Sequence, residues 1–448
     1  MTAKSFTCRW SLLALTAVLS FISTVFSSAQ PVGIAPDKET LSAPFSPKDE
    51  AAFKAPEKVF YPETWFHFIG GNVSKEGIDA DLQAIADAGI SGVQWFHGYF
   101  GGPWPATGHQ LTTLSPEWEE MVGYLGRKAK ELGLRLTVQT CPGWSMAGGP
   151  WIQPENAMRT LVWSRTDIPA GEKASSPLPK STAEEPWRDY HDITVLAFPT
   201  PLGDTGKALL PESIDGAEDW KTLLQGLNSK DIQLKPGTTS TISFTLPKGE
   251  VIRTLELPPV GAFSHNFCYD PGIHVKLTGK VAGEEKILVD ADFPMSNWQD
   301  GGANNMVFAC NEVEGVERYT FTLTNVHPAS VRFVRFWSAA RKNSWRGEAG
   351  WTLIAKEMDQ QHTEQNPLAF VKTKDIIDIS DKMTPDGRLD WTAPAAISPQ
   401  GTWTVLRIGH VNAGKRNSPA PPEATGWECS KFDPKRAEIQ FANCVGML

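Results

Sequence analysis

The feature that most constrains the fold is an alternation of strand-like and helical segments between about residues 61 and 164. "TWFHFIGG" is an apolar strand candidate, and Ser74 then starts a helix with one apolar face. "SGVQWFH" is the next strand candidate, Ser115 starts a second helix, and "LRLTVQT" is a third strand candidate. Strands separated by helices in this way predict a parallel sheet with helical crossovers.

The pattern changes after about Asp167, where short alternating segments such as "STISFTLP", "IHVKLTG" and "YTFTLTN" are separated by turns rich in Pro, Gly and Asn. These segments predict an antiparallel β-sandwich. The first pattern then returns, with "TWTVLRIGH" and "ATGWEC" as strand candidates and a helix that begins at Asp433-Pro434. We therefore expect the sandwich to be inserted into the α/β part.

The predicted fold is multidomain, α/β plus all-β: a partial (β/α) TIM-type barrel interrupted by an inserted antiparallel β-sandwich. The expected boundaries are a signal peptide at 1–29, the first part of the barrel at 30–166, the sandwich at 167–365 and a truncated barrel segment at 366–448. Only about five or six barrel strands are present, whereas a closed barrel needs eight. Because an open half-barrel exposes a sheet edge, we expect a fragment of a longer protein. The alternative is an open doubly wound sheet.

The N-terminus has the pattern of a targeting segment. Lys4 and Arg9 precede an apolar run, Trp10–Phe26, and the small residues "SSAQ" follow it. This order predicts a signal peptide cleaved after Ala29, and the run is short for a membrane span. We expect a secreted or periplasmic protein with no membrane anchor after cleavage.

Charge and cysteine usage exclude some classes of function. The net charge of -9 argues against a nucleic-acid partner, which favours a basic surface. The cysteines beyond the signal peptide form no CxxC pair, so a zinc site is not expected. Cys268 and Cys310 lie in the same all-β region and are able to pair in an oxidising compartment. The 17 tryptophans suit either a well-packed core or stacking platforms for sugar rings.

In β/α barrels the functional residues lie at the carboxyl ends of the strands and in the loops that follow. This rule selects His67 near the end of the first strand, Gln94 and Trp95 in the second, and Gln139 and Trp144 at and after the third. His67 and Trp95 are equally compatible with the core. HExxH, P-loop, GxSxG and GxGxxG motifs are absent from the sequence.

Glu428 lies at the tip of "ATGWEC", where a carboxylate would face the mouth of a barrel. The alternative is a salt bridge to Lys431, Lys415 or Arg416. Glu423 is five residues upstream, which on one strand corresponds to about 16 Å at roughly 3.3 Å per residue. An odd spacing also places the two carboxylates on opposite faces of a strand, so they are not expected to act as a direct acid/base pair.

Four segments carry a resemblance to a known family. They are "WFHFIGGNVSKEGIDADLQAIADAGISGVQ", "SPEWEEM", "LGLRLTVQTCPGWSMAGGPWIQPE" and "GTWTVLRIGHVNAGKRNSPAPPEATGWECSKF". In these segments the chain resembles glycoside hydrolase family 106, the α-L-rhamnosidases. The resemblance implies a catalytic barrel with attached β domains, and calcium-dependent hydrolysis of terminal α-L-rhamnose with inversion. The expected substrate is a rhamnose-containing polysaccharide or glycoside.

The resemblance also implies roles for single residues. An inverting glycosidase needs an acid and a base about 6.5–9.5 Å apart. Glu428 matches the acid, and the base is expected beyond Leu448. Calcium binds hard oxygen ligands, for which Glu423 is the candidate and Asn417 a further contributor. The residues expected to shape the sugar site are His67, Gln94, Trp95, Gln139, Trp144 and Asn417.

Two other functions stay open from the sequence. One is a non-catalytic carbohydrate-binding protein, and the other is a barrel glycosidase that acts on a different sugar. A second carboxylate facing Glu428 would distinguish an enzyme from a binding protein.

Overall fold

The computed structural model describes residues 38–96, 104–143, 147–181, 189–226, 230–259, 272–294, 305–342, 364–395 and 398–446. The chain divides into two compact units. One consists of residues 1–144, 419–423 and 447–448, and the other of residues 145–418 and 424–446. We call them the α/β unit and the β-rich unit and describe each by itself.

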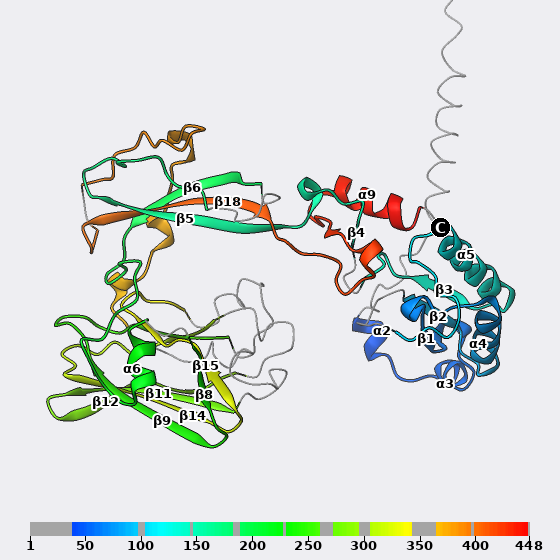
Figure 1. Cartoon of the computed structure of the whole chain (residues 1–448), viewed down its shortest axis with the longest axis horizontal. Helices are drawn as coiled ribbons and strands as arrows, with labels where there is room; N and C mark the ends of the chain where they lie inside the picture. Colours follow the sequence, from blue (N-terminus) through cyan, green and yellow to red (C-terminus); the bar gives the residue numbers. More distant parts are fainter. Residues whose placement is uncertain are drawn as a thin grey trace, which may run out of the picture. The chain divides into compact units, whose positions relative to one another are not determined.

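The α/β unit contains the predicted strand–helix alternation. Strands β1 (Glu63–His67), β2 (Gly92–Phe96) and β3 (Arg135–Val138) form a parallel sheet in the order β1-β2-β3. Helices α4 (Lys75–Asp87) and α5 (Pro116–Glu131) connect them (Figure 1). The parallel sheet with helical crossovers is therefore confirmed for this region.

Local sequence explains where the two helices begin and which face they bury. Ser74 Oγ accepts a hydrogen bond from Gly77 N at 3.1 Å, and Ser115 Oγ accepts one from Trp118 N at 3.2 Å. Such caps satisfy backbone donors that the first helical turn leaves free. The apolar stripes of both helices then pack on one face of the sheet, where the buried residues include Ile78, Leu82, Val93, Trp95, Val122 and Leu125.

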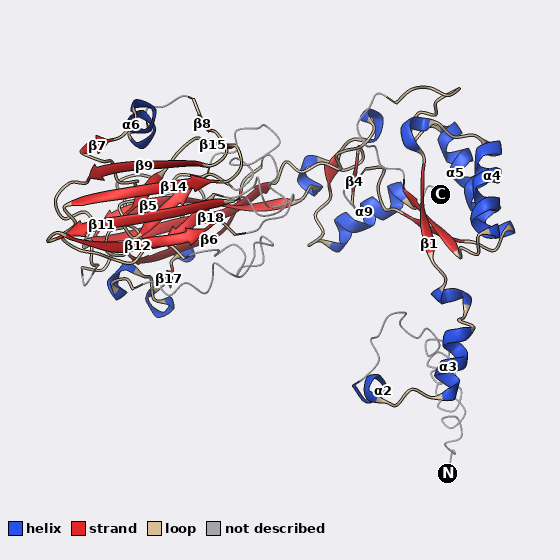
Figure 2. Ribbon diagram, turned by 90° about the horizontal axis from the view of Figure 1, so that it is seen from below, coloured by secondary structure: helices blue, strands red, loops and turns tan. Residues whose placement is uncertain are grey.

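Shorter elements precede and follow β1. They are α2 (Lys38–Ser42), α3 (Pro47–Lys54), η1 (Lys58–Phe60) and η2 (Ile69–Gly71). Figure 2 labels α2 and α3. None of the residues of α3 is buried.

The β-rich unit begins with a four-stranded sheet in the order β17-β6-β18-β5. Its strands are β5 (Arg159–Pro169), β6 (His191–Pro199), β17 (Ile377–Asp378) and β18 (Thr402–Asn412). "TWTVLRIGH" was predicted to resume the α/β pattern, and this is wrong: it forms β18, which pairs antiparallel with both β5 and β6. Strand β5 also runs across the boundary predicted between residues 166 and 167.

The predicted antiparallel sandwich follows in the same unit. A five-stranded sheet contains β12 (Glu284–Asp292), β11 (Ile273–Val281), β14 (Arg318–Asn325), β9 (Thr238–Thr245) and β7 (Ser213–Asp215). A three-stranded sheet contains β13 (Met306–Ala309), β10 (Thr254–Leu257) and β16 (Arg335–Trp337). Phe321 of one sheet and Phe336 of the other are buried in one core, with ring centroids 6.3 Å apart.

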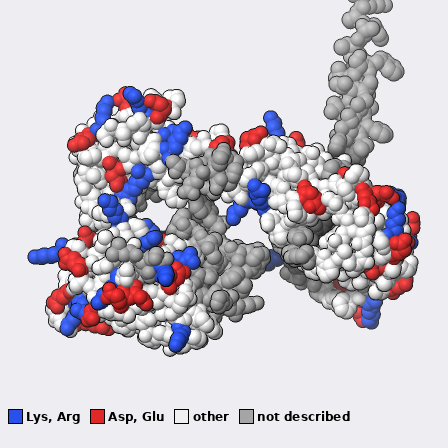
Figure 3. Space-filling model, viewed as in Figure 1, with Lys and Arg blue, Asp and Glu red and all other residues white. Residues whose placement is uncertain are grey.

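The remaining elements of the β-rich unit are short. Two strand pairs are β8 (Ile232–Leu234) with β15 (Ala329–Val331) and β4 (Gly148–Gly149) with β19 (Trp427–Glu428). The helices are α6 (Glu218–Leu224), α9 (Pro434–Cys444), η3 (Pro154–Asn156), η5 (Pro367–Ala369), η6 (Thr373–Asp375) and η7 (Ser380–Lys382). Figure 3 shows acidic and basic side chains interspersed on the face that it draws.

Several predictions concern features that the structure does not reach or does not contain. No sheet among the described residues closes into a barrel, so the TIM-type barrel stays a prediction. The proposed signal peptide, 1–29, and Cys268 lie outside the described residues. Cys310, the cysteine that could pair with Cys268, is a buried free cysteine in the structure. Over the part of the chain that the structure describes, no helix is both long and apolar enough to cross a membrane.

Candidate active site

The face of the parallel sheet opposite the helices carries three of the predicted site residues. Side chains alternate between the two faces of a strand, so His67 and Gln94 lie on the face away from α4 and α5. Gln139 follows β3 and continues the same alternation. Trp65 also lies on this face, and it is 59% exposed.

Three aromatic rings form a cluster on this open face. Trp65 stacks on Phe96 with centroids 6.0 Å apart, and the His67 ring is 5.3 Å from Phe96 and 5.6 Å from Trp65. Burial lowers the pKa of His67, so its imidazole is neutral at neutral pH. The cluster is suited to the CH-rich face of a sugar ring. Sequence analysis missed Trp65 and Phe96, although the period-two pattern of "TWFHF" places Trp65 beside His67.

The two glutamines have structural partners within the α/β unit. Gln94 Nε2 donates to Glu63 Oε2 at 3.2 Å, and Arg135 pairs with the same carboxylate and lowers the pKa of Glu63. Gln139 Nε2 donates to the Gly143 carbonyl at 2.6 Å and so holds the loop after β3. Trp144, the next predicted residue, lies outside the described residues.

Trp95 occupies the other face of the sheet, and its predicted sugar contact is not supported. Its side chain is 1% exposed, and its ring lies 5.6 Å from Trp118 and 5.3 Å from Phe68. The neighbouring Gln94 is on the open face, so the strand alternation directs Trp95 toward the helices. Trp95 is a core residue, which was the alternative interpretation of the sequence.

The two tryptophans of neighbouring strands give a matched test of this assignment. We expect Trp95→Ala to destabilise the chain by about 3–5 kcal/mol, because it leaves a cavity between the sheet and the helices. Trp65→Ala should cost less than about 1 kcal/mol, because its ring is largely exposed. Urea unfolding followed by far-ultraviolet circular dichroism measures both. Equal losses of stability would contradict the assignment of faces.

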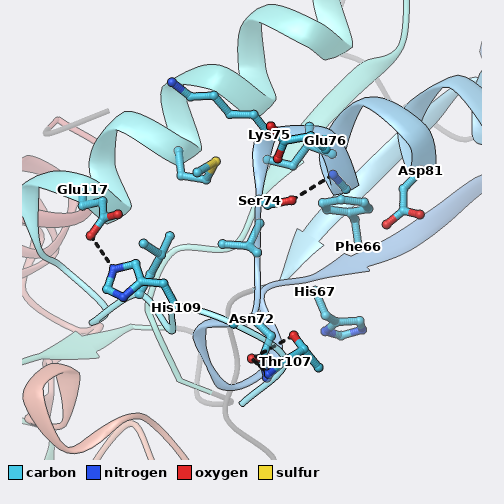
Figure 4. Close-up of a pocket in the computed structure, with 16 residues that line it drawn as sticks. Phe66, His67, Asn72, Ser74, Lys75, Glu76, Asp81, Thr107, His109 and Glu117 are labelled. Carbon is cyan, nitrogen blue, oxygen red and sulfur yellow. Dashed lines mark hydrogen bonds and ion pairs between the residues drawn. The ribbon is translucent and has the colours of Figure 1, made fainter. Parts of the chain in front are cut away.

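A cavity of about 520 Å³ opens at the carboxyl end of β1. Its wall includes His67, the start of α4 and residues 107–109 (Figure 4). Asn72 Oδ1 accepts a hydrogen bond from Thr107 N at 3.2 Å, and His109 Nε2 lies 2.9 Å from Glu117 Oε2. The cavity therefore combines amide, imidazole and carboxylate groups at the end of a strand, where ligands of β/α folds bind.

Glu423 lies in η8 (Pro422–Ala424) rather than on a strand. Its Oε1 accepts a hydrogen bond from Thr113 N at 3.0 Å, which attaches residues 419–423 to the α/β unit. Calcium needs about 6–8 oxygen ligands. Within the described ranges no group of three His, Cys, Asp or Glu side chains is placed to hold a metal. These residues alone do not fit the calcium site that the resemblance implied.

Glu428 lies in β19 of the β-rich unit, and its backbone is fixed from both sides. Its N–H donates to the Lys415 carbonyl at 3.0 Å, and its carbonyl accepts from Met158 N at 2.7 Å. The side chain is 16% exposed and forms an ion pair with Lys431. The salt bridge considered from the sequence is therefore present, in a carboxylate that remains partly accessible.

Glycines allow the strand that carries Glu428 to approach β4 closely. A Cβ on Gly426 would lie 1.8 Å from the Gly149 carbonyl oxygen, and one on Gly148 would lie 2.8 Å from the Trp427 carbonyl oxygen. These glycines therefore permit the close approach of two segments of the chain.

Asn417 is fully buried, and its side chain forms hydrogen bonds with backbone groups near Glu428. Its Nδ2 donates to the Ala424 carbonyl at 2.9 Å and the Gly148 carbonyl at 3.3 Å. Its Oδ1 accepts from Gly426 N at 2.8 Å. This network argues against the direct sugar or calcium contact predicted for Asn417. It indicates a residue that positions the β4–β19 pair.

Comparison with known proteins identifies the family of this chain. The family model described as alpha-L-rhamnosidase, glycoside hydrolase family 106, matches residues 54–448. The chain belongs to this α-L-rhamnosidase family.

The solved structure of a rhamnosidase from Novosphingobium sp. PP1Y is similar to this family member, with a TM-score of 0.65 and 25% sequence identity. The similarity covers 89% of this chain and 37% of that one. A putative beta-glucuronidase of Formosa agariphila is 40% identical over 155 residues, which are 34% of this chain and 13% of the relative. This member of the α-L-rhamnosidase family thus spans a minor part of the length of both proteins.

Proposed function

We propose that this chain carries part of the catalytic apparatus of a glycoside hydrolase that removes terminal α-L-rhamnose from a polysaccharide or glycoside. The observation that carries the proposal is the family match over residues 54–448. The aromatic cluster that includes His67, at the carboxyl end of β1 in the α/β unit, supports it, and so, independently, does the hydrogen-bonded backbone of Glu428 in the β-rich unit. In this proposal β1, β2 and β3 are the first strands of a TIM-type barrel.

Glu428 is the proposed proton donor to the leaving oxygen in an inverting reaction. The ion pair with Lys431 is made by the ionised carboxylate, so a proton-donating Glu428 requires this pair to open. The general base is a second carboxylate about 6.5–9.5 Å away. We propose that this base lies beyond Leu448, in a longer protein. His67, at the carboxyl end of β1, is a separate candidate for sugar binding in the α/β unit.

Hydrolysis of an aryl α-L-rhamnoside tests the proposal, with the purified chain and a longer gene product assayed side by side. We expect no turnover by the chain that ends at Leu448 and turnover by the longer protein. Circular dichroism serves as the control that the shorter chain is folded. Turnover by the shorter chain would contradict the location of the base. A folded longer protein that is inactive on α-L-rhamnosides would contradict the substrate.

A further inference from the structure

A second cavity, of about 360 Å³, lies in the β-sandwich beside α6. Buried Leu223, Leu224 and Val334 belong to both its wall and the sandwich core. Leu209 N donates to the Phe336 carbonyl at 2.7 Å and so fixes another part of the wall. A cleft with an apolar wall and a volume in this range is typical of small-molecule sites.

The rim of this cleft carries more positive than negative charge. Its charged residues are Arg332, Arg335 and Asp231. Arg332 Nε lies 3.7 Å from Asp231 Oδ2, and its side chain is 54% exposed. Asp231 is shared, because its Oδ2 also accepts a hydrogen bond from Ser330 Oγ at 3.0 Å. The rim is thus locally basic in a chain of net charge -9.

Arg335 is exposed, and its guanidinium carbon lies 4.3 Å from the centroid of the Phe333 ring. Within the described ranges no carboxylate forms an ion pair with it. The guanidinium is therefore held over an aromatic ring at the edge of an apolar cleft, with hydrogen-bond donors available for an anion. The exposed Leu210 forms another part of the rim.

We propose that this cleft binds a uronic acid residue of a glycan. The planar guanidinium groups match a carboxylate, which accepts two parallel hydrogen bonds. The apolar wall and Phe333 match the CH-rich face of a sugar ring. A neutral sugar leaves the basic rim without a counter-charge. The volume of the cleft suits a short stretch of glycan rather than a folded partner. This binding site is distinct from the proposed site of rhamnoside hydrolysis.

Calorimetric titration of the whole chain with trigalacturonic acid, and with its methyl ester as the uncharged counterpart, tests the site. We expect the acid to bind at least about tenfold more tightly than the ester, because only the acid forms charge-assisted hydrogen bonds. The double variant R332Q/R335Q should lose about tenfold or more in affinity for the acid. Leu210→Asp should also lower the affinity for the acid, because it adds a negative charge at an exposed position of the rim.

Arg318→Gln is the matched control, since Arg318 lies on the same sandwich and pairs with Asp215 away from the cleft. It should bind trigalacturonic acid like the unaltered chain. Equal affinity for acid and ester would overturn the proposal, as would unchanged acid binding in both cleft variants. The experiment measures binding alone, so its outcome is independent of whether the chain hydrolyses a rhamnoside.

Discussion

If a longer protein hydrolyses rhamnosides as proposed, replacing Glu428 by Gln in it is expected to lower turnover of rhamnosides with poor leaving groups by about 10²- to 10⁴-fold. Gln keeps the size of the side chain and removes the proton that the acid donates. A good leaving group, such as the nitrophenolate of nitrophenyl α-L-rhamnoside, departs without that proton. Turnover of such a substrate should therefore fall much less. The measurement is kcat/KM for an alkyl and a nitrophenyl α-L-rhamnoside in the same preparation.

The dependence on the leaving group separates an acid from other roles of Glu428. A general base would be needed for both substrates, so an equal loss with both would contradict the assignment as acid. Activity close to that of the unaltered enzyme would remove Glu428 from the reaction altogether. Glu438→Gln is the control, because Glu438 is an exposed carboxylate on the adjoining helix α9.

A single methyl group at Gly426 is expected to separate β19 from β4. The added Cβ would lie 1.8 Å from the Gly149 carbonyl oxygen, which is backbone and cannot rotate away. Overpacking of this kind costs about 1–3 kcal/mol or more. The shift would also break the bond from Gly426 N to Asn417, so Glu428 would lose its fixed position.

Hydrogen exchange measures this effect of Gly426→Ala directly. The amides of Glu428 and Met158 donate to Lys415 and to Glu428, and both should exchange faster in the variant. Turnover by the longer protein should fall along with this protection. Gly126→Ala is a suitable control, because Gly126 lies in α5 and its added Cβ would meet Leu136 at an ordinary 3.7 Å. Unchanged protection in Gly426→Ala would contradict the proposed close packing.

Local periodicity was sufficient to predict the strands and helices from β1 to β3. Ser74 and Ser115 mark helix starts, and the apolar stripes of the helices define the face on which the sheet is buried. The same alternation distinguishes Trp65 from Trp95 once the buried face is known. Trp95 lies near a strand end, which made it a candidate, but the alternation of side chains directs it to the buried face.

Pairing between distant segments was beyond what periodicity can predict. The pattern of "TWTVLRIGH" is compatible with a parallel or an antiparallel partner, and its partners β5 and β6 precede it by roughly 200 residues. The role of Asn417 is equally non-local, since one of its bonds reaches Gly148. For Glu428, the sequence predicted the strand and named Lys431 as a partner. The glycine contacts that hold that strand depend on residues far apart in the chain.

The position of β18 between β5 and β6 has a consequence for synthesis of the protein. Both neighbours of β18 leave the ribosome long before β18 itself, which begins at Thr402. At about 5–20 residues per second the wait for β5 is on the order of 10–50 s. During that time β5 and β6 present unpaired edges, the form of backbone most open to pairing with another chain. Slow translation of this region therefore prolongs the aggregation-prone stage, whereas independent folding of the sandwich during the wait brings the two strands closer together.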